Sequence, residues 1–284
     1  MRIDPLTVRV SSPIDLLADA LRALYGHREV LAEDAFADFH IALARPKTIR
    51  RFIQQQVCFE FDGMVPFKPL PLSQTYPMFE WGLNWCIASQ YHRFVMVHAA
   101  VIERDGFVVV MPGEPGAGKS TLCAALVSRG WRLFSDEMAL ITPLSAWLTP
   151  IPRPICLKNA SIDLMRQFAP DHYMGKVFRD TRKGDVAHMG APEDAVARAA
   201  EPGEARFVIF PRYRAHAPLS VQPVAKPEAV LRLAEQCFNY SQFATEGFHT
   251  LCNVVDRSHC HAFEYSRLDD AIDYFAALKP GRPS

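Results

Sequence analysis

The alternation of apolar and polar residues predicts helices and strands that follow one another along most of the chain. Apolar residues recur at helical spacing in residues 15–25, 162–168, 227–237 and 268–278. Strand-like runs, continuously apolar or alternating, occur at residues 39–43, 56–62, 93–102, 107–111, 131–141 and 206–211. This succession favours an α/β fold with a mixed sheet.

The remaining segments predict one buried helix, one tight turn and several connectors. Residues 78–88 are apolar around most of a helical circumference, which indicates a buried helix packed on the sheet. Asp105-Gly106 lies between two strand-like runs and favours a two-residue hairpin turn. Connectors are expected at the Pro-rich stretches 67–72 and 150–154, and a mobile loop at the polar residues 178–187. We divide the chain into an N-terminal α+β region, residues 1–75, and a larger domain, residues 76–284.

Composition narrows the class of protein. The chain has 284 residues, a formal net charge of zero, and 49% hydrophobic residues. Zero net charge disfavours a dedicated nucleic-acid-binding protein, which would carry a basic excess. The apolar runs are too short for a membrane span, and the first residues lack the apolar core of a signal peptide. We expect a cytoplasmic protein with neither nucleic acid nor membrane as a partner.

The seven cysteines are scattered and form no C-x-x-C pair. In a chain that we expect in the cytoplasm, this pattern indicates reduced thiols, most of them buried. Cys252, His259, Cys260 and His261 lie close in sequence, so a metal site is conceivable, but their spacing matches no common zinc pattern. Structural or surface roles are favoured.

Residues 113–120, GEPGAGKS, match the phosphate-binding P-loop pattern G-x-x-x-x-G-K-[ST]. A strand-like run precedes them, a helical segment at 121–128 follows, and Gly130 is placed to end that helix. In this context backbone N–H groups and the helix N-terminus hold anionic phosphate. Lys119 is expected to reach the β- and γ-phosphates of ATP, and the Ser120 hydroxyl to hold Mg²⁺. The expected nucleotide-binding residues are Gly113, Glu114, Pro115, Gly116, Ala117, Gly118, Lys119, Ser120 and Thr121.

Asp136 and Glu137 interrupt an otherwise apolar strand directly after the P-loop helix. Burying a carboxylate is costly unless another group pairs with it. We expect this strand to lie beside the P-loop strand, with its acids pointing at the phosphates. One acid would hold Mg²⁺ and the other would accept a proton from an attacking hydroxyl. The alternative is a strand end on the surface with two solvated acids.

Other polar residues give weaker signals. His98 stands in an apolar strand, where a lone histidine is usually a hydrogen-bonded core residue. Arg153, between two prolines, is a candidate phosphate ligand to which Lys158 adds charge, and a solvated loop is the alternative. Residues 183–188 are either a solvated loop or one that closes over the acceptor. Glu80 and Asn84, one helical turn apart, are expected to satisfy each other or the backbone.

The segment from His98 through GEPGAGKSTLCAALVSRGWRLFSDE resembles the catalytic core of the HPr kinase/phosphorylase family. The shared pattern is a strand with His, a GxxGxGKS loop, a helix, an Arg-Gly-x-Arg-Leu turn and two acids. That family has a P-loop similar to that of phosphoenolpyruvate carboxykinase, so the resemblance implies an α/β P-loop kinase core with a mixed sheet. More narrowly, the chain resembles HPr-kinase-related kinases of the A type, whose relatives include lasso-peptide precursor kinases.

The resemblance implies roles for individual residues. Asp136 matches the base toward the acceptor serine, His98 the active-site histidine beside it, and Ser120 a metal ligand. Glu137 stands where the family usually has a second Asp, and it keeps an oxygen ligand for Mg²⁺. The similarity is specific over residues 93–141. We do not find the family's downstream signature, so the resemblance does not extend to its phosphorylase activity. Residues 1–75 also differ from the family's N-terminal domain, so HPr is not the substrate that we expect.

The leading hypothesis is an ATP-dependent serine kinase with Mg²⁺ as cofactor and a peptide or small protein as substrate. Asp136, His98 and Lys119 would be its catalytic residues, and residues 1–75 would contribute to substrate recognition. A homo-oligomer is compatible with the family. The alternatives are a small-molecule kinase with the same site and a nucleotide-gated binding protein that needs no base.

Overall fold

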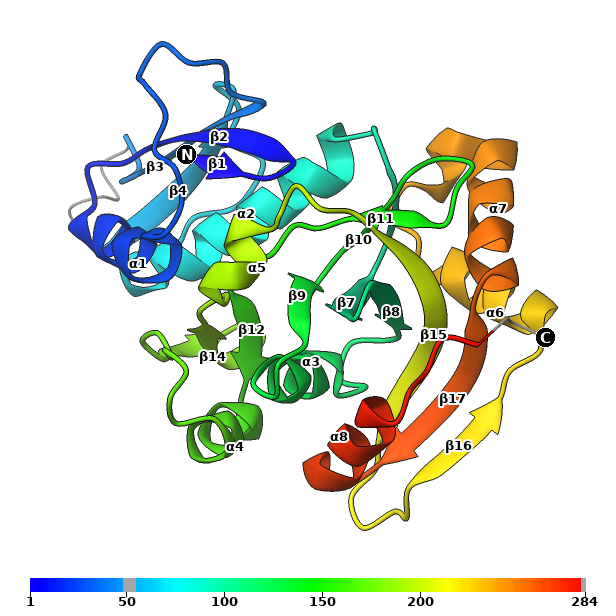
Figure 1. Cartoon of the computed structure of the whole chain (residues 1–284). Coiled ribbons are helices and arrows are strands. Elements are labelled where there is room, and N and C mark those ends of the chain that lie inside the picture. Colours follow the sequence, from blue (N-terminus) through cyan, green and yellow to red (C-terminus); the bar gives the residue numbers. More distant parts are fainter. Residues whose placement is uncertain (48–54, 282–284) are drawn as a thin grey trace.

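The computed structural model describes residues 1–47 and 55–281, and it has an N-terminal sheet followed by a larger α/β part (Figure 1). The N-terminal elements are β1 (Arg2–Ile3), β2 (Leu6–Ser11), α1 (Asp15–Tyr25), β3 (Phe39–Ala44), β4 (Gln56–Phe61), β5 (Leu70–Pro71), the 3₁₀ turn η2 (Leu72–Gln74) and α2 (Thr75–Gln90). The central elements are β6 (Val95–Val97), β7 (Ala99–Arg104), β8 (Phe107–Pro112), α3 (Lys119–Val127), β9 (Arg132–Ser135), β10 (Ala139–Ile141), β11 (Trp147–Thr149), β12 (Ile155–Lys158) and α4 (Ala160–Phe168). The remaining elements are β13 (Phe178–Thr181), β14 (Gly184–Met189), α5 (Glu193–Ala197), β15 (Gly203–Tyr213), β16 (Ser220–Pro223), α6 (Lys226–Glu235), α7 (Tyr240–Asp256), β17 (His259–Tyr265) and α8 (Leu268–Ala276).

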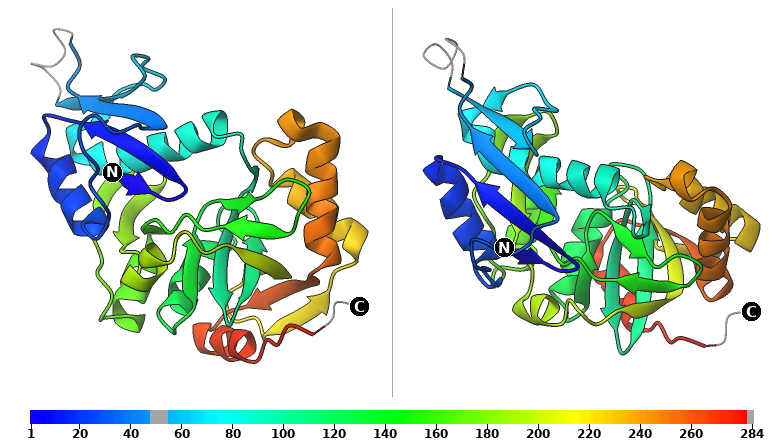
Figure 2. Two further views of the ribbon diagram at one scale, coloured as in Figure 1. Left: turned by 45° about the horizontal axis from the view of Figure 1, so that its top comes forward. Right: turned by 90° about the horizontal axis from the view of Figure 1, so that it is seen from above.

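The helix predicted at residues 78–88 exists as α2, extended at both ends, and its burial is confirmed. It packs against α1 and the five-stranded N-terminal sheet, in strand order β1-β2-β3-β4-β5. Gly82 permits the close approach, because a Cβ there would overlap the Phe59 ring of β4. The same apolar core takes in Met96 and Leu140 of the larger sheet, so the two parts share a continuous interior. Figure 2 shows from two sides how α2 lies between the N-terminal sheet and the larger part.

The larger sheet has nine strands and is mixed, as the sequence predicts. β15 runs parallel to both β8 and β17, whereas β7 is antiparallel to β8 and to β9. The strand after the P-loop helix therefore does not lie beside the P-loop strand, and that expectation is wrong. The reason is the tight turn at Asp105 (φ 50°) and Gly106 (φ 83°), which folds β7 back onto β8. β7 therefore takes the position beside β8 that was expected for β9.

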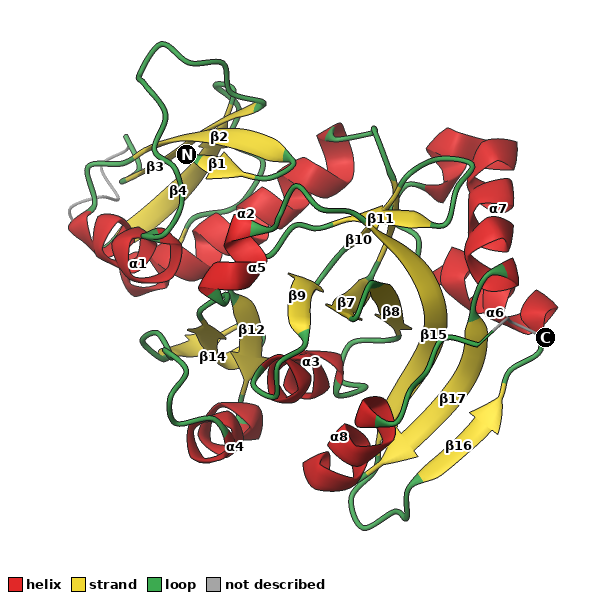
Figure 3. Ribbon diagram, viewed as in Figure 1, coloured by secondary structure: helices red, strands yellow, loops and turns green. Residues whose placement is uncertain are grey.

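Helices cover both faces of this sheet (Figure 3). On β8, Phe107, Val109 and Met111 pack into the core formed with α3, α4 and α8. Val108 and Val110 point into the opposite core, formed with α6 and α7. Burial on both faces explains the unbroken apolar run of the P-loop strand.

Two strands predicted as continuous are each interrupted at their polar residues. The run 93–102 divides into β6 and β7 at His98, and the run 131–141 divides into β9 and β10 at residues 136–138. The two runs are antiparallel neighbours, since Val97 pairs with Ala139 and Val101 lies opposite Ser135. Between these pairs the ladder opens, and the opening contains His98 on one side and Asp136 and Glu137 on the other.

Residues 178–187 form most of a β-hairpin, so the mobile-loop prediction is wrong. β13 and β14 pair at Phe178–Val186, and β14 also pairs with β12 in a three-stranded sheet. The hairpin is held because Ala187 and Met189 are buried in the α3–α4 core and Phe178 stacks on Tyr76.

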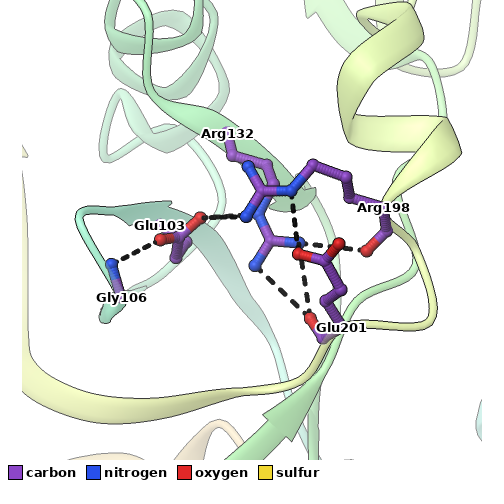
Figure 4. Close-up of polar contacts among 5 residues, drawn as sticks. All are labelled: Glu103, Gly106, Arg132, Arg198 and Glu201. Atoms are coloured by element: carbon purple, nitrogen blue, oxygen red, sulfur yellow. Dashed lines mark hydrogen bonds and ion pairs between the residues drawn. The ribbon is translucent and has the colours of Figure 1, made fainter.

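A buried ion pair fastens the end of the β7–β8 hairpin that lies away from the P-loop (Figure 4). Arg132 Nε donates to Glu103 Oε2 at 2.6 Å, and both side chains are almost fully buried. The remaining Arg132 donors reach the carbonyls of Arg198 and Glu201, and Glu103 Oε1 accepts the Gly106 N–H. Removing one partner of such a pair leaves a buried, uncompensated charge, so this cluster anchors the base of the P-loop strand.

Candidate active site

The P-loop connects β8 to the N-terminus of α3, and the strand–loop–helix context predicted for it is confirmed. Gly116 and Gly118 have φ angles of 91° and 92°, in the left-handed region that favours glycine. The ends of two parallel strands brace the loop. Tyr213 of β15 donates its N–H to the Ala117 carbonyl at 3.0 Å, and the Tyr265 hydroxyl of β17 donates to the Gly118 carbonyl at 3.1 Å.

The Lys119 side chain is buried and folded back onto the loop. Its Nζ donates to the carbonyls of Gly113 and Glu114, the latter at 3.0 Å. Burial lowers the pKa of Lys119, and the charges of Glu137 and Asp136 oppose that shift. The ammonium group therefore lies within electrostatic reach of both acids. Ser120 and Thr121 follow it in the first turn of α3.

Asp136 is 5% exposed and occupies the opening in the β-ladder. Its Oδ2 accepts the Cys156 N–H at 3.0 Å, whereas Oδ1 has no hydrogen-bond partner among the described residues. Burial, followed by the charge of Glu137, raises the pKa of Asp136 to about 7. The Cys156 N–H and the nearby Ser120 hydroxyl act in the opposite direction. A buried carboxyl with one unused oxygen beside the P-loop serine is suited to accept a proton.

Glu137 is paired with His98 across the opening. His98 Nε2 lies 3.4 Å from Glu137 Oε2, and these side chains are 20% and 24% exposed. Burial would raise the pKa of Glu137, but the hydrogen bond from His98 and the charges of Lys158 and Lys183 outweigh it and hold that pKa at about 2. Adjacent carboxyls with pKa values on opposite sides of their usual range are suited to different tasks.

The donor set fits Mg²⁺. The Glu137 carboxylate and the Ser120 hydroxyl are oxygen donors, the type that this cation prefers. No group of three or more His, Cys, Asp or Glu residues that could hold a metal occurs in residues 1–47 and 55–281. Mg²⁺ commonly needs only one or two protein carboxylates together with substrate phosphates. The site is therefore suited to a cation that arrives with a nucleotide.

Arg153 lies in the connector between β11 and β12, and its guanidinium is buried against α2. Its Nη2 donates to Glu80 Oε2 at 3.0 Å and to Asn84 Oδ1 at 2.6 Å. Glu80 Oε1 accepts the hydroxyls of Tyr25 and Tyr76 at 2.7 and 2.6 Å. The expectation that Glu80 and Asn84 satisfy each other or the backbone is therefore wrong. The role of Arg153 toward phosphate stays a prediction.

Two lysines lie on the side of Glu137 toward the three-stranded sheet. Lys158 is at the end of β12, and Lys183 in the β13–β14 turn extends over the Trp81 ring at 5.4 Å. His188 does not belong to a closing loop: it is 2% exposed, its ring meets that of Tyr76 edge-on at 5.0 Å, and burial lowers its pKa to about 4.

The Cys/His residues near the C-terminus do not converge on a metal. His261 Nδ1 lies 2.9 Å from the Tyr274 hydroxyl, and the Cys260 thiol is buried near the Ser258 carbonyl. No helix in the described part of the chain has the length and apolar character to cross a membrane.

Three aromatic residues at the site have no sequence signal that marks them: Tyr213, Tyr265 and Phe238. The tyrosines brace the P-loop, and the Phe238 ring lies 5.6 Å from the His98 ring. Each comes from a segment more than 90 residues from its partner, so only the fold brings them together.

The comparisons with known proteins do not show which family this chain belongs to. No protein-family model and no curated protein matches the chain. A solved structure similar to this chain is the HPr(Ser) kinase/phosphatase from Coxiella burnetii, with 14% identity over 64% of this chain and 95% of that chain. The TM-score of 0.28 is too low to support a functional conclusion. A function for this chain therefore has to rest on its own residues.

Proposed function

We propose that this protein is an ATP-dependent kinase that transfers the γ-phosphoryl group of Mg-ATP to a hydroxyl of a peptide or small protein. The observation that supports this most is the Asp136 carboxyl, buried beside the P-loop with Oδ1 unpartnered in the described part of the chain. A protein that uses ATP only as a switch needs a phosphate cradle but no such base.

The reaction is an in-line displacement. Asp136 Oδ1 accepts the hydroxyl proton while the acceptor oxygen forms a bond to the γ-phosphorus, the bond from that phosphorus to the bridging oxygen breaks, and ADP leaves. Lys119 exchanges its loop carbonyls for phosphate oxygens and offsets their charge, and the α3 N-terminus and the backbone of Gly116 and Gly118 hold the phosphates.

Glu137 and Ser120 would hold Mg²⁺, which supplies charge neutralisation on the β- and γ-phosphates when bound. His98 keeps the Glu137 carboxylate ionised and fixes its orientation through their hydrogen bond.

A serine of a peptide or small protein is the acceptor that we favour. The resemblance of residues 93–141 to HPr-kinase-related kinases supports serine, and helix α2, which packs on the N-terminal sheet, supplies contacts next to the site. Glu80 and Asn84 of α2 bind Arg153, and a small pocket lined by Asn84, Arg153, Asp136 and Glu137 connects that helix with the acids. Helix α2 in this position is suited to contact the acceptor.

The test is intact-mass spectrometry of candidate hydroxyl-bearing peptides incubated with the protein, Mg²⁺ and ATP. We expect a gain of one phosphoryl group with the wild-type chain and none with Lys119→Ala. ADP release stimulated by small metabolites, without peptide phosphorylation, would replace the proposal with a small-molecule kinase. ATP binding without transfer to any acceptor would replace it with a nucleotide-gated binding protein.

A further inference from the structure

The segment between α6 and α7 covers one edge of β6, next to His98. The His98 N–H donates to the Gln236 carbonyl at 2.8 Å, and the Phe238 N–H donates to the Met96 carbonyl at 2.9 Å. Val97 and Cys237 form an antiparallel bridge between these two bonds. Residues 236–238 thus act as a short extra strand that fixes the backbone of the active-site histidine.

Asn239 locks this segment. Its side chain is 1% exposed, its Oδ1 accepts the Met96 N–H at 2.9 Å, and its Nδ2 donates to the Phe94 carbonyl at 2.9 Å. The buried Asn239 amide is thus hydrogen-bonded to the backbone on both sides of Val95. These bonds leave the backbone of the preceding residue, Phe238, little freedom. Phe238 therefore stands on a rigid backbone.

The Phe238 ring is nevertheless 47% exposed, and its centroid lies 5.6 Å from that of His98 with 40° between the ring planes. His98 and Glu137 are the partly exposed members of the site, whereas Asp136 is buried. Phe238 thus lies beside the part of the site that is open to solvent. A rigid, half-exposed aromatic ring loses little conformational entropy when a second apolar side chain covers it.

We propose that Phe238 determines acceptor specificity by binding an apolar side chain that flanks the phosphorylated hydroxyl in a peptide. This inference rests on the kinase function proposed above. It narrows the substrate class to peptides with an apolar residue beside the acceptor serine. Phe238 takes no part in the chemical step, because Asp136 and Lys119 carry that step without it.

The experiment uses synthetic peptides that contain one serine and differ only in its neighbours, which are Phe, Leu, Gly or Asp. We expect the wild-type chain to phosphorylate the Phe and Leu peptides with a kcat/KM at least ~10-fold above that of the Gly peptide. Phe238→Ala should remove this preference by raising the KM for the Phe and Leu peptides to that for the Gly peptide, while the KM for ATP stays unchanged. Phe238→Leu should restore part of the preference.

Phe248→Ala is the matched control, since Phe248 is an equally exposed phenylalanine of α7 (44%) without a contact to His98. A preference that survives in Phe238→Ala, or that is lost equally in Phe248→Ala, would overturn the inference while the kinase function stands. A wild-type chain that binds ATP but phosphorylates none of the peptides would overturn both the kinase function and the role of Phe238. That outcome differs from lost selectivity, in which all peptides are still phosphorylated.

Discussion

His98 Nε2 lies 3.4 Å from Glu137 Oε2, across the point where the pairing of two antiparallel strands is interrupted. Neither residue would meet the other in an uninterrupted ladder, because Met138 is the residue in register with His98. The opening lets a histidine from one strand orient a carboxylate from the next. Removing His98 should therefore affect the binding of Mg²⁺ by Glu137.

His98→Ala should weaken the apparent affinity for Mg²⁺ in phosphoryl transfer by about 10–100-fold, the usual cost of losing a partner that orients a metal ligand. The change removes the bond that keeps the pKa of Glu137 low. Transfer rates measured against Mg²⁺ concentration check this, with His92→Ala, a change at an exposed histidine, as the control. Equal Mg²⁺ dependence in both variants would show that His98 does not support Glu137.

Asp136→Asn should stabilise the protein at pH 8 and have a smaller effect at pH 4. Burial raises the pKa of Asp136 to about 7, whereas an unfolded aspartate titrates near ~4. Between these pH values the folded state keeps a proton that the unfolded state has released, so this group's contribution to stability is lost as pH rises towards 7. Melting temperatures of both proteins across this range check the sign. A Tm difference that does not grow with pH would contradict the shifted pKa.

Gly118→Ala should destabilise the fold and remove ATP binding, whereas Gly130→Ala should only destabilise it modestly. Both glycines have φ near 90°, so both substitutions carry the left-handed strain of about 1–2 kcal/mol. A Cβ at Gly118 would also lie 2.6 Å from the Tyr265 hydroxyl and 3.0 Å from Tyr213 Cβ, while nothing lies within 4 Å at Gly130. Urea denaturation and ATP titration compare the two. Equal losses would mean that the tyrosine brace is unimportant.

Glu80 and Arg153 should prove energetically coupled. Because Arg153 is buried, Glu80→Ala leaves its guanidinium without its charge partner, at a cost of about 3–5 kcal/mol. The double variant with Arg153→Ala should lose much less than the sum of the single losses. A double-mutant cycle by urea denaturation checks this. Additive losses, with a raised KM for ATP in Arg153→Ala alone, would instead support the phosphate role predicted for Arg153.

The parts of the fold that depend on contiguous residues were predictable from the sequence. The P-loop cradles phosphate with its own backbone, so its spacing and its flanks are sufficient to place it between β8 and α3. The turn at Asp105-Gly106 was predictable for the same reason. Strand neighbours depend on pairing between distant segments. The position of β9, two places from β8 in the sheet, was therefore not predictable from the sequence.

The surroundings of the site were less predictable. The cluster of Glu80 with Tyr25 and Arg153 joins residues 55 and 73 positions from Glu80, and no local pattern encodes such contacts. The 17-residue helix α7 was not predicted, because its polar residues and the non-helical Ala244 obscure the helical spacing of its apolar residues. Asp136, Glu137 and His98 were identifiable as anomalies in apolar runs, but the opening in the ladder that joins them was not.

The most direct test of Asp136 as the base is a single-turnover measurement with the γ-phosphate of ATP labelled, which compares the wild-type chain with Asp136→Asn at saturating Mg-ATP and an acceptor peptide. We expect that label reaches the peptide hydroxyl in the wild type and that the rate falls by about 10²–10⁴-fold in the variant. ATP affinity should be unchanged, because Asp136 does not belong to the phosphate cradle. Transfer at a rate close to wild type in Asp136→Asn would contradict the assignment of Asp136 as the base.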